Sequence, residues 1–394
     1  MPSLSEEYTL YYFRISYFSG KLQGYLRYKE LPHRLHEPSW WEMVDLLYPA
    51  TGLMKVPVLQ TPENEWLQDS TPMMEWLEQQ HPEGRILPED PFLSFACHLL
   101  EDYADEWLWR PALHYRWNFP VDAIALSHRF TYEFLSDLPM PRWFATRFIR
   151  WRQDRIYGRG DGIVPATRTH VESIYLRNLQ WLQAIFETRP YLLGDKPCLA
   201  DFGFFASMFR HFSMDPTPAA LMQNQAPAVY EWVARMWNTR WSSVQNASWL
   251  SSLPEDWGPW WKDMAEAYLP YLHANAKAWQ EGREHFSLTI QGTTYQRLPT
   301  VQYRAWCRER LQERFLALPE EVQAKMQAFL EEKQCWKPLW RDGVMPSMLH
   351  SDTQPPFCRP RKVGRLEKLW MYFTGTHWEV PHTTRPPSIS PDKT

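Results

Sequence analysis

Apolar residues follow two different periods along the first ninety residues. A short β-branched and aromatic run over residues 9–13 is followed, from Lys21 onward, by apolar residues at helical spacing. Short apolar runs predict further strands over 33–36, 55–59 and 65–67. A helix is predicted after Asp69-Ser70, because both residues are common at helix starts. This alternation predicts an α/β domain over residues 1–88.

Beyond residue 90 the spacing becomes helical and strand patterns disappear. Apolar positions three and four residues apart predict helices over 92–109, 130–138 and 171–186, so an all-helical domain is expected over 89–250. Residues 251–394 are less regular and form a third, mostly helical segment, with helices predicted over 260–281, 301–316 and 319–334. Prolines recur between 355 and 391, which favours an extended, partly disordered strap at the end of this segment.

Composition indicates a globular protein of a reducing compartment. Hydrophobic residues make up 44% and charged residues 22% of the chain, which supplies a core and excludes disorder throughout. The net charge of −4 lacks the basic excess of a dedicated nucleic-acid binder. Five scattered cysteines exclude a disulfide scaffold, and no apolar run approaches ~18 residues. A cytoplasmic location without a nucleic-acid or membrane partner is therefore expected.

The stretch from Tyr11 to Lys21 is the first candidate for chemistry. It passes from strand to helix and places the hydroxyl groups of Ser16 and Ser19 at the helix start. Free N–H groups and the positive end of the helix dipole favour an anion there, and a hydroxyl donor beside them can hold a thiolate. The alternative is that Ser16 or Ser19 only caps the helix.

The second candidate is Lys55-Val56-Pro57, followed by Asp69-Ser70. A cis Val56–Pro57 bond would turn the backbone of Val56 outward as a template for an extended peptide, whereas the alternative is a trans proline at a sheet edge. Asp69-Ser70 suits an α-amino acid, with the ammonium at Asp69 and the carboxylate at Ser70 and free N–H groups. Helix capping alone is again the alternative.

Together these segments resemble the glutathione transferase superfamily over about residues 8–241. Ser16 is similar in position to the catalytic residue of the serine and cysteine classes, and Tyr12 to that of the tyrosine classes. Lys55-Val56-Pro57 resembles the cis-proline segment that pairs with the cysteinyl backbone of glutathione, and Asp69-Ser70 resembles the pair that grips its γ-glutamyl end. Residues 191–202 resemble the folding motif of the helical domain, with Cys198 where Ser or Thr usually caps.

The resemblance implies a thioredoxin-like domain followed by a helical domain, with glutathione as co-substrate. It implies that a hydroxyl group stabilises the glutathione thiolate, which then attacks an apolar electrophile. The first candidate for this hydroxyl group is Ser16, followed by Tyr12 and then Ser19. Arg14 and Lys21 are candidates for the glycyl carboxylate, with a solvated surface position as the alternative. No metal is expected. The candidates for an aromatic substrate wall are Tyr103, Trp107, Trp109 and Trp117.

Two other functions stay open. One is a lyase, dehalogenase or peroxidase reaction that also uses glutathione. The other is a non-catalytic interaction protein, because residues from 257 onward have no counterpart in the short transferases and either cover the cleft or build a partner surface. The basic cluster over 359–362 could contact an acidic partner. A homodimer is typical of the family and stays open here.

Overall fold

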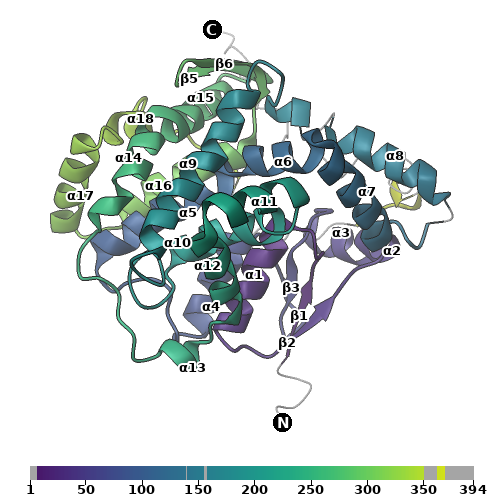
Figure 1. Ribbon diagram of the computed structural model, residues 1–394, viewed down its shortest axis with the longest axis horizontal. Helices are drawn as coiled ribbons and strands as arrows, with labels where there is room; N and C mark the ends of the chain where they lie inside the picture. Colours follow the sequence, from purple (N-terminus) through teal and green to yellow (C-terminus); the bar gives the residue numbers. More distant parts are fainter. Residues whose placement is uncertain (1–6, 139, 155–157, 350–361, 369–394) are drawn as a thin grey trace, which may run out of the picture.

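The computed structural model describes residues 7–138, 140–154, 158–349 and 362–368 (Figure 1). Its N-terminal part is a four-stranded mixed sheet of order β2-β1-β3-β4. β1 pairs parallel with β2 and antiparallel with β3, and β3 pairs antiparallel with β4. This thioredoxin-like sheet agrees with the expected fold. The strands are β1 (Tyr8–Tyr11), β2 (His33–His36), β3 (Val58–Gln60) and β4 (Trp66–Gln68).

Helices border the sheet and fix both candidate segments. α1 (Tyr17–Tyr28) begins four residues before the predicted Lys21, because Ser16 caps it. β3 begins at Val58 rather than at Lys55, since a proline without an N–H cannot join the ladder from position 57. Three short helical turns, which the sequence did not predict, join β2 to β3: α2 (Trp40–Glu42), η1 (Met43–Leu47) and α3 (Tyr48–Thr51). α4 (Ser70–Gln80) follows β4.

The helical domain is arranged around α10 (Leu199–Ser207), whose residues are all buried between α1 and α5. The predicted helix over 130–138 is wrong in its bounds: α7 runs from Pro120 to Phe134, with proline at the first helical position. The other elements are α5 (Pro91–Trp107), α6 (Trp109–Asn118), α8 (Arg142–Gln153), η3 (Arg159–Asp161), α9 (Arg168–Phe186), η4 (Met208–Phe212), α11 (Pro216–Gln225), α12 (Pro227–Asn238) and α13 (Trp241–Val244).

The start of α10 contains the predicted folding motif. The Asp201 carboxylate accepts hydrogen bonds from the Cys198 N–H at 2.9 Å and from the Leu192 N–H at 3.0 Å. The Cys198 thiol donates to the same carboxylate at 3.2 Å. Burial raises the pKa of Asp201 to about 6. The Asp therefore organises this turn even though a cysteine stands at the capping position.

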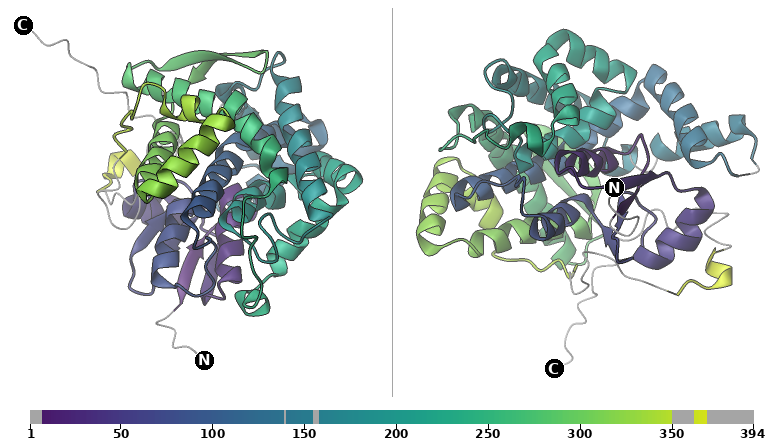
Figure 2. Two further views of the ribbon diagram at one scale, coloured as in Figure 1. Left: turned by 90° about the vertical axis from the view of Figure 1, so that its left-hand side faces the viewer. Right: turned by 90° about the horizontal axis from the view of Figure 1, so that it is seen from below.

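The third segment is folded onto the helical domain (Figure 2). One continuous core joins Leu10 of the sheet, Leu99 of α5 and Trp260 and Phe315 of this segment. The prediction of no strands beyond residue 90 is wrong, because a hairpin turns at Gln291-Gly292, both with positive φ. The elements are η5 (Glu255–Trp257), α14 (Gly258–Asp263), η6 (Met264–Tyr268), α15 (Leu269–Gln280), β5 (His285–Ile290), β6 (Thr293–Pro299), α16 (Gln302–Leu316), α17 (Glu320–Glu332) and α18 (Trp336–Trp340).

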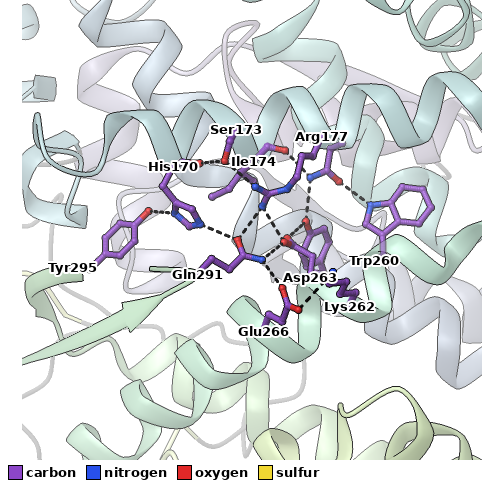
Figure 3. Close-up of polar contacts among 12 residues, drawn as sticks. His170, Ser173, Ile174, Arg177, Trp260, Lys262, Asp263, Glu266, Gln291 and Tyr295 are labelled. Atoms are coloured by element: carbon purple, nitrogen blue, oxygen red, sulfur yellow. Dashed lines mark hydrogen bonds and ion pairs between the residues drawn. The ribbon is translucent and has the colours of Figure 1, made fainter. Parts of the chain in front are cut away.

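A polar network fastens the hairpin to α9 (Figure 3). The Gln291 amide lies 3.0 Å from His170 Nε2 and donates to Asp263 at 2.9 Å. The Arg177 guanidinium donates to the same Asp263 carboxylate at 2.9 Å. Tyr295 of β6 is hydrogen-bonded to His170 Nδ1 at 2.7 Å. The hairpin is thus held by α9 and α14.

Within the described residues, no helix combines the length and apolarity needed to cross a bilayer. Of the predicted strap over 355–391 the structure describes residues 362–368, where 365–368 form a helical turn rather than an extended segment. The prolines of the strap and residues 359–361 of the basic cluster lie outside the described residues.

Candidate functional site

A cavity of about 720 Å³ lies where the sheet, the helical domain and the third segment meet. The predicted residues Ser16, Lys55, Val56, Pro57, Asp69 and Ser70 all line it. Three segments that were predicted separately along the sequence therefore converge on one cavity. Its other walls include Trp109, Arg116, Trp117, Phe134, His211, Tyr303 and Arg304.

Ser16 lies at the N-terminus of α1 and borders the cavity. Its side-chain oxygen accepts from the Ser19 N–H at 3.3 Å, so the capping role is present. Within the described residues, the N–H groups of Tyr17 and Phe18 donate to no backbone acceptor, and both residues also line the cavity. These N–H groups and the helix dipole create a site that favours an anion beside the Ser16 hydroxyl.

Arg116 of α6 fixes the turn that carries Ser16. Its guanidinium donates to the Ile15 carbonyl at 2.8 Å and is paired with Asp215 at 2.7 Å. The pair is buried, so the charged guanidinium is retained by its partner rather than by water. No local pattern indicates a role for Arg116, because its contacts are about one hundred residues away in the chain.

The structure places Tyr12 and Ser19 outside the cavity lining. Burial raises the pKa of Tyr12, and its protonated hydroxyl donates to Glu37 at 3.3 Å rather than toward the cavity. Ser19 is fully buried, and its hydroxyl has no hydrogen-bond partner among the described residues. Of the three candidate hydroxyl groups, only Ser16 reaches the space where a ligand fits.

The Val56–Pro57 peptide bond is cis, the less common of the two alternatives. Within the described chain, neither the N–H nor the C=O of Val56 makes a backbone hydrogen bond. Both residues border the cavity. Val56 therefore offers a free backbone donor and acceptor to an extended ligand, as a strand edge does.

Asp69 occupies the N-cap position of α4 with φ at 76°, and its side chain makes no capping hydrogen bond to the described residues of the helix. A residue with a Cβ rarely adopts such a φ, and such outliers collect at functional sites. Burial raises the pKa of its carboxyl group, while a hydrogen bond from Tyr303 and the nearby Lys21 act in the opposite direction. Beside it, the buried Gln68 amide oxygen has no partner among the described residues. The Asp69 carboxylate is the acceptor at this end of the cavity that suits an ammonium group.

Lys55 and Glu106 add opposite charges to the same polar end. The exposed side chain of Lys55 lines the cavity. Desolvation by the surrounding protein lowers the pKa of its ammonium group. Within the described residues Lys55 makes no ion pair. Burial raises the pKa of Glu106, and Arg304 opposes this at an N–O distance of 3.6 Å. Lys55 is thus available to a ligand carboxylate.

The third segment completes the cavity with residues that the sequence did not indicate. Tyr303, at the start of α16, donates a hydrogen bond to the Asp69 carboxylate. Arg304, its neighbour, is paired with Asp161 at 2.8 Å and lies near Glu106. The expectation that this segment covers the cleft therefore describes its position correctly: it forms one wall.

The predicted aromatic wall is half correct. Trp109 and Trp117 line the cavity, whereas Tyr103 and Trp107 are buried in the core. The Tyr103 hydroxyl donates to Asp263 at 2.7 Å, so the third segment covers the face of α5 that was expected to meet a substrate. Met43, Met54, Leu113, Phe130 and Phe134 add to the apolar side of the cavity.

His211 also borders the cavity and escaped sequence reasoning. It is buried beside Tyr17, with ring centroids 5.4 Å apart, and burial lowers its pKa well below the usual value. Its Nδ1 has no hydrogen-bond partner among the described residues. An uncharged, buried imidazole therefore borders the cavity.

Neither predicted cation for the glycyl carboxylate reaches the cavity. Arg14 is exposed and paired with Glu37 at 2.6 Å. The alternative of a solvated surface position is wrong for Lys21, which is fully buried and paired with Glu101 and Asp105. These carboxylates raise the pKa of Lys21, although burial alone would lower it. Lys21 is a structural cation that joins α1 to α5.

Comparisons with known proteins agree with this architecture. The glutathione S-transferase N-terminal domain matches residues 10–85, and the glutathione S-transferase C-terminal domain matches residues 168–239. A search of curated proteins returned no match.

Solved structures with a similar chain path include a glutathione S-transferase of Methylobacterium radiotolerans in complex with glutathione sulfonate. It is 18% identical, with 63% of this chain and 98% of that chain covered and a TM-score of 0.38. The β-etherase LigF of Sphingobium sp. strain SYK-6 is 20% identical, with 58% and 94% covered and a TM-score of 0.40. FzlA of C. crescentus is 20% identical, with 58% and 87% covered and a TM-score of 0.37. Because these TM-scores are below 0.5, the family assignment depends on the two matched domains.

Proposed function

Because the chain belongs to the glutathione transferase superfamily through both matched domains, we propose that it binds glutathione in the cavity and transfers it to an apolar electrophile. The observation that carries the proposal is the convergence of Ser16, Val56 and Asp69 on one cavity. Each was selected for a different part of the ligand. A single tripeptide can engage all three only if they border the same cavity, as they do.

The polar end of the cavity suits the charged ends of glutathione. In the proposed pose, Asp69 pairs with the γ-glutamyl ammonium, and Ser70 with the N–H groups of α4 takes the adjacent carboxylate. The cysteinyl backbone pairs with the free N–H and C=O of Val56. Lys55 attracts a ligand carboxylate, because its ammonium group is positively charged and makes no ion pair within the described chain.

The sulfur would then lie at the start of α1. A thiol has a reference pKa of ~8.5, and a helix N-terminus with a hydroxyl donor lowers it, so more thiolate is present near neutrality. Ser16 supplies that hydroxyl, and the N–H groups of Tyr17 and Phe18 supply the positive end of the helix. The thiolate attacks the electrophile, a new carbon–sulfur bond forms, and the leaving group departs with the displaced electron pair.

The electrophile would occupy the apolar side of the cavity. Trp109, Trp117 and Phe134 border that side, and an aromatic wall favours an apolar substrate. A glutathione-dependent lyase, dehalogenase or peroxidase would use the same glutathione site with another acceptor. These reactions are distinguished by identifying the products that form from a panel of electrophiles, which includes epoxides, haloalkanes and hydroperoxides.

The test is binding of glutathione by the full-length protein. We expect retention on immobilised glutathione and a rise in melting temperature with millimolar free glutathione, because a ligand that binds only the folded state stabilises it. Ophthalmic acid, in which a methyl group replaces the thiol, separates binding from chemistry and should also stabilise the protein. Absence of any thermal shift with glutathione would favour the alternative, a non-catalytic protein that retains only the fold.

A further inference from the structure

One surface of the helical domain differs from the rest of the molecule. α8 buries Ala145, Ile149 and Gln153 against the protein and turns its other side to solvent. That outer side, called here the α8 face, consists of Arg142, Trp143, Phe144, Arg147, Phe148 and Arg150, all exposed. Figures 1 and 2 show α7 and α8 at one end of the molecule, remote from α17 and α18.

The aromatic rings of the α8 face form a continuous row. The ring centroids of Trp143 and Phe144 lie 6.0 Å apart, and those of Phe144 and Phe148 lie 6.5 Å apart. Trp143 is 70% exposed, and the adjacent α7 adds Tyr132 at 71% and Val121 at 63%. Single exposed apolar residues are ordinary, but a contiguous set of large ones marks a contact surface.

Positive charge accompanies this aromatic row. α8 contains no Asp or Glu, and Arg142, Arg147 and Arg150 make no ion pair with any described residue. Three free guanidinium groups interleaved with Trp and Phe on one helix are typical of helices that lie in a lipid interface. There the rings occupy the boundary between headgroups and acyl chains, and the cations contact anionic headgroups.

We propose that the α8 face docks on the surface of an anionic lipid bilayer, without crossing it. A second copy of the chain fits less well, because a two-fold contact through this face would bring arginines against arginines. The residues outside the described ranges after position 349 contain three acidic and four basic residues, so they offer no complementary charge. A nucleic acid would need a groove to follow, whereas this helix is exposed at the end of the molecule.

Docking in this way would bring a lipid-dissolved substrate close to the cavity. The inner sides of α7 and α8 contribute Phe130, Phe134 and Gln153 to its lining. An apolar electrophile that partitions into membranes would therefore meet the protein at the two helices that border its binding space. This consequence depends on the proposed transferase function, whereas membrane docking does not.

The test is co-sedimentation of the full-length protein with vesicles, in the absence of glutathione. We expect binding to phosphatidylcholine vesicles containing phosphatidylglycerol, weaker binding at high salt, and little binding to pure phosphatidylcholine. The variant Arg142→Gln/Arg147→Gln/Arg150→Gln should lose about 100-fold in partitioning, since each arginine contributes about fivefold. Trp143→Ala/Phe148→Ala should weaken binding while retaining the salt dependence.

A matched control replaces three exposed arginines elsewhere, Arg85→Gln/Arg297→Gln/Arg341→Gln, and should bind as the wild type does. Circular dichroism and melting temperature check that every variant is folded. Absence of binding to anionic vesicles overturns the proposal. Arginine-dependent binding of oligothymidine or α8-dependent dimerisation in sedimentation velocity, without vesicle binding, also overturns it and identifies the other partner.

Discussion

Replacing Tyr303 with phenylalanine removes one hydroxyl group and retains the ring that borders the cavity. In the wild-type protein this hydroxyl donates to the Asp69 carboxylate and opposes the rise in pKa that burial causes. A hydrogen bond to a charged group contributes about 1.5–3 kcal/mol. Because one pKa unit corresponds to about 1.36 kcal/mol, the pKa of Asp69 should rise by about one to two units in the variant.

Glutathione affinity should follow this ionisation. Asp69 must be ionised to pair with an ammonium group, so both proteins should bind equally well at a pH above both pKa values. As the pH falls, the variant should lose affinity first. The ratio of the variant's Kd to that of the wild type should increase through the interval between the two pKa values and reach about 10- to 100-fold at a pH below both. Isothermal titration calorimetry over a series of pH values measures this difference directly.

Tyr268→Phe is the matched control for this experiment. Its hydroxyl also donates to a buried carboxylate, that of Asp102 at 2.5 Å, but neither residue lines the cavity. This variant should lose stability without any shift in the pH profile of binding. Superimposable profiles for Tyr303→Phe and the wild type would refute the reasoning. An equal loss of affinity at every pH would mean that Tyr303 acts only as part of the wall.

Three further predictions concern single residues. Ser16→Ala should lower conjugation while costing about 1 kcal/mol of stability, measured by turnover and by denaturant unfolding; unchanged turnover would remove Ser16 from the mechanism. Asp69→Ala should raise the Kd for glutathione and have a smaller effect on thiolate formation, which the pH dependence of turnover reports. An unaltered Kd would discard the ammonium assignment. Burial lowers the pKa of His98 to about 4, so the unfolded chain binds this proton more readily. Stability should therefore fall by up to about 3 kcal/mol as the pH drops from about 6.5 to about 4. His98→Gln should flatten that slope in urea titrations, and an identical slope would contradict the assignment.

The sequence allowed prediction of those site residues whose signals are local. Ser16 precedes a helix, Pro57 interrupts an apolar run, and Asp69 starts the next helix, so a few neighbouring residues identify each. Local spacing likewise predicts an α/β domain followed by an all-helical one, whereas the thioredoxin-like arrangement of the sheet was implied by the family resemblance. The hairpin could also have been found, because apolar residues alternate at 286, 288 and 290 before Gln291-Gly292 and a β-branched and aromatic run, Thr293 to Tyr295, follows it.

Residues that depend on distant partners could not be predicted in this way. Tyr303 reaches Asp69 only because α16 packs beside the cavity, and nothing near position 303 indicates that contact. Lysines are almost never fully buried unless paired, and the partners of Lys21, Glu101 and Asp105, lie on another helix. Tyr103 and Trp107 lie on a helix that is covered on both sides, which the aromatic pattern alone does not reveal.

The wall formed by α16 has a consequence for the order of events on the ribosome. Asp69 leaves the exit tunnel long before its partner Tyr303 has been translated. At about 5–20 residues per second, the delay between the two is on the order of 12–50 seconds. A nascent chain therefore exposes a half-built pocket, and a substrate or a chaperone can reach it during that interval. Full ligand affinity should arise only near the end of synthesis.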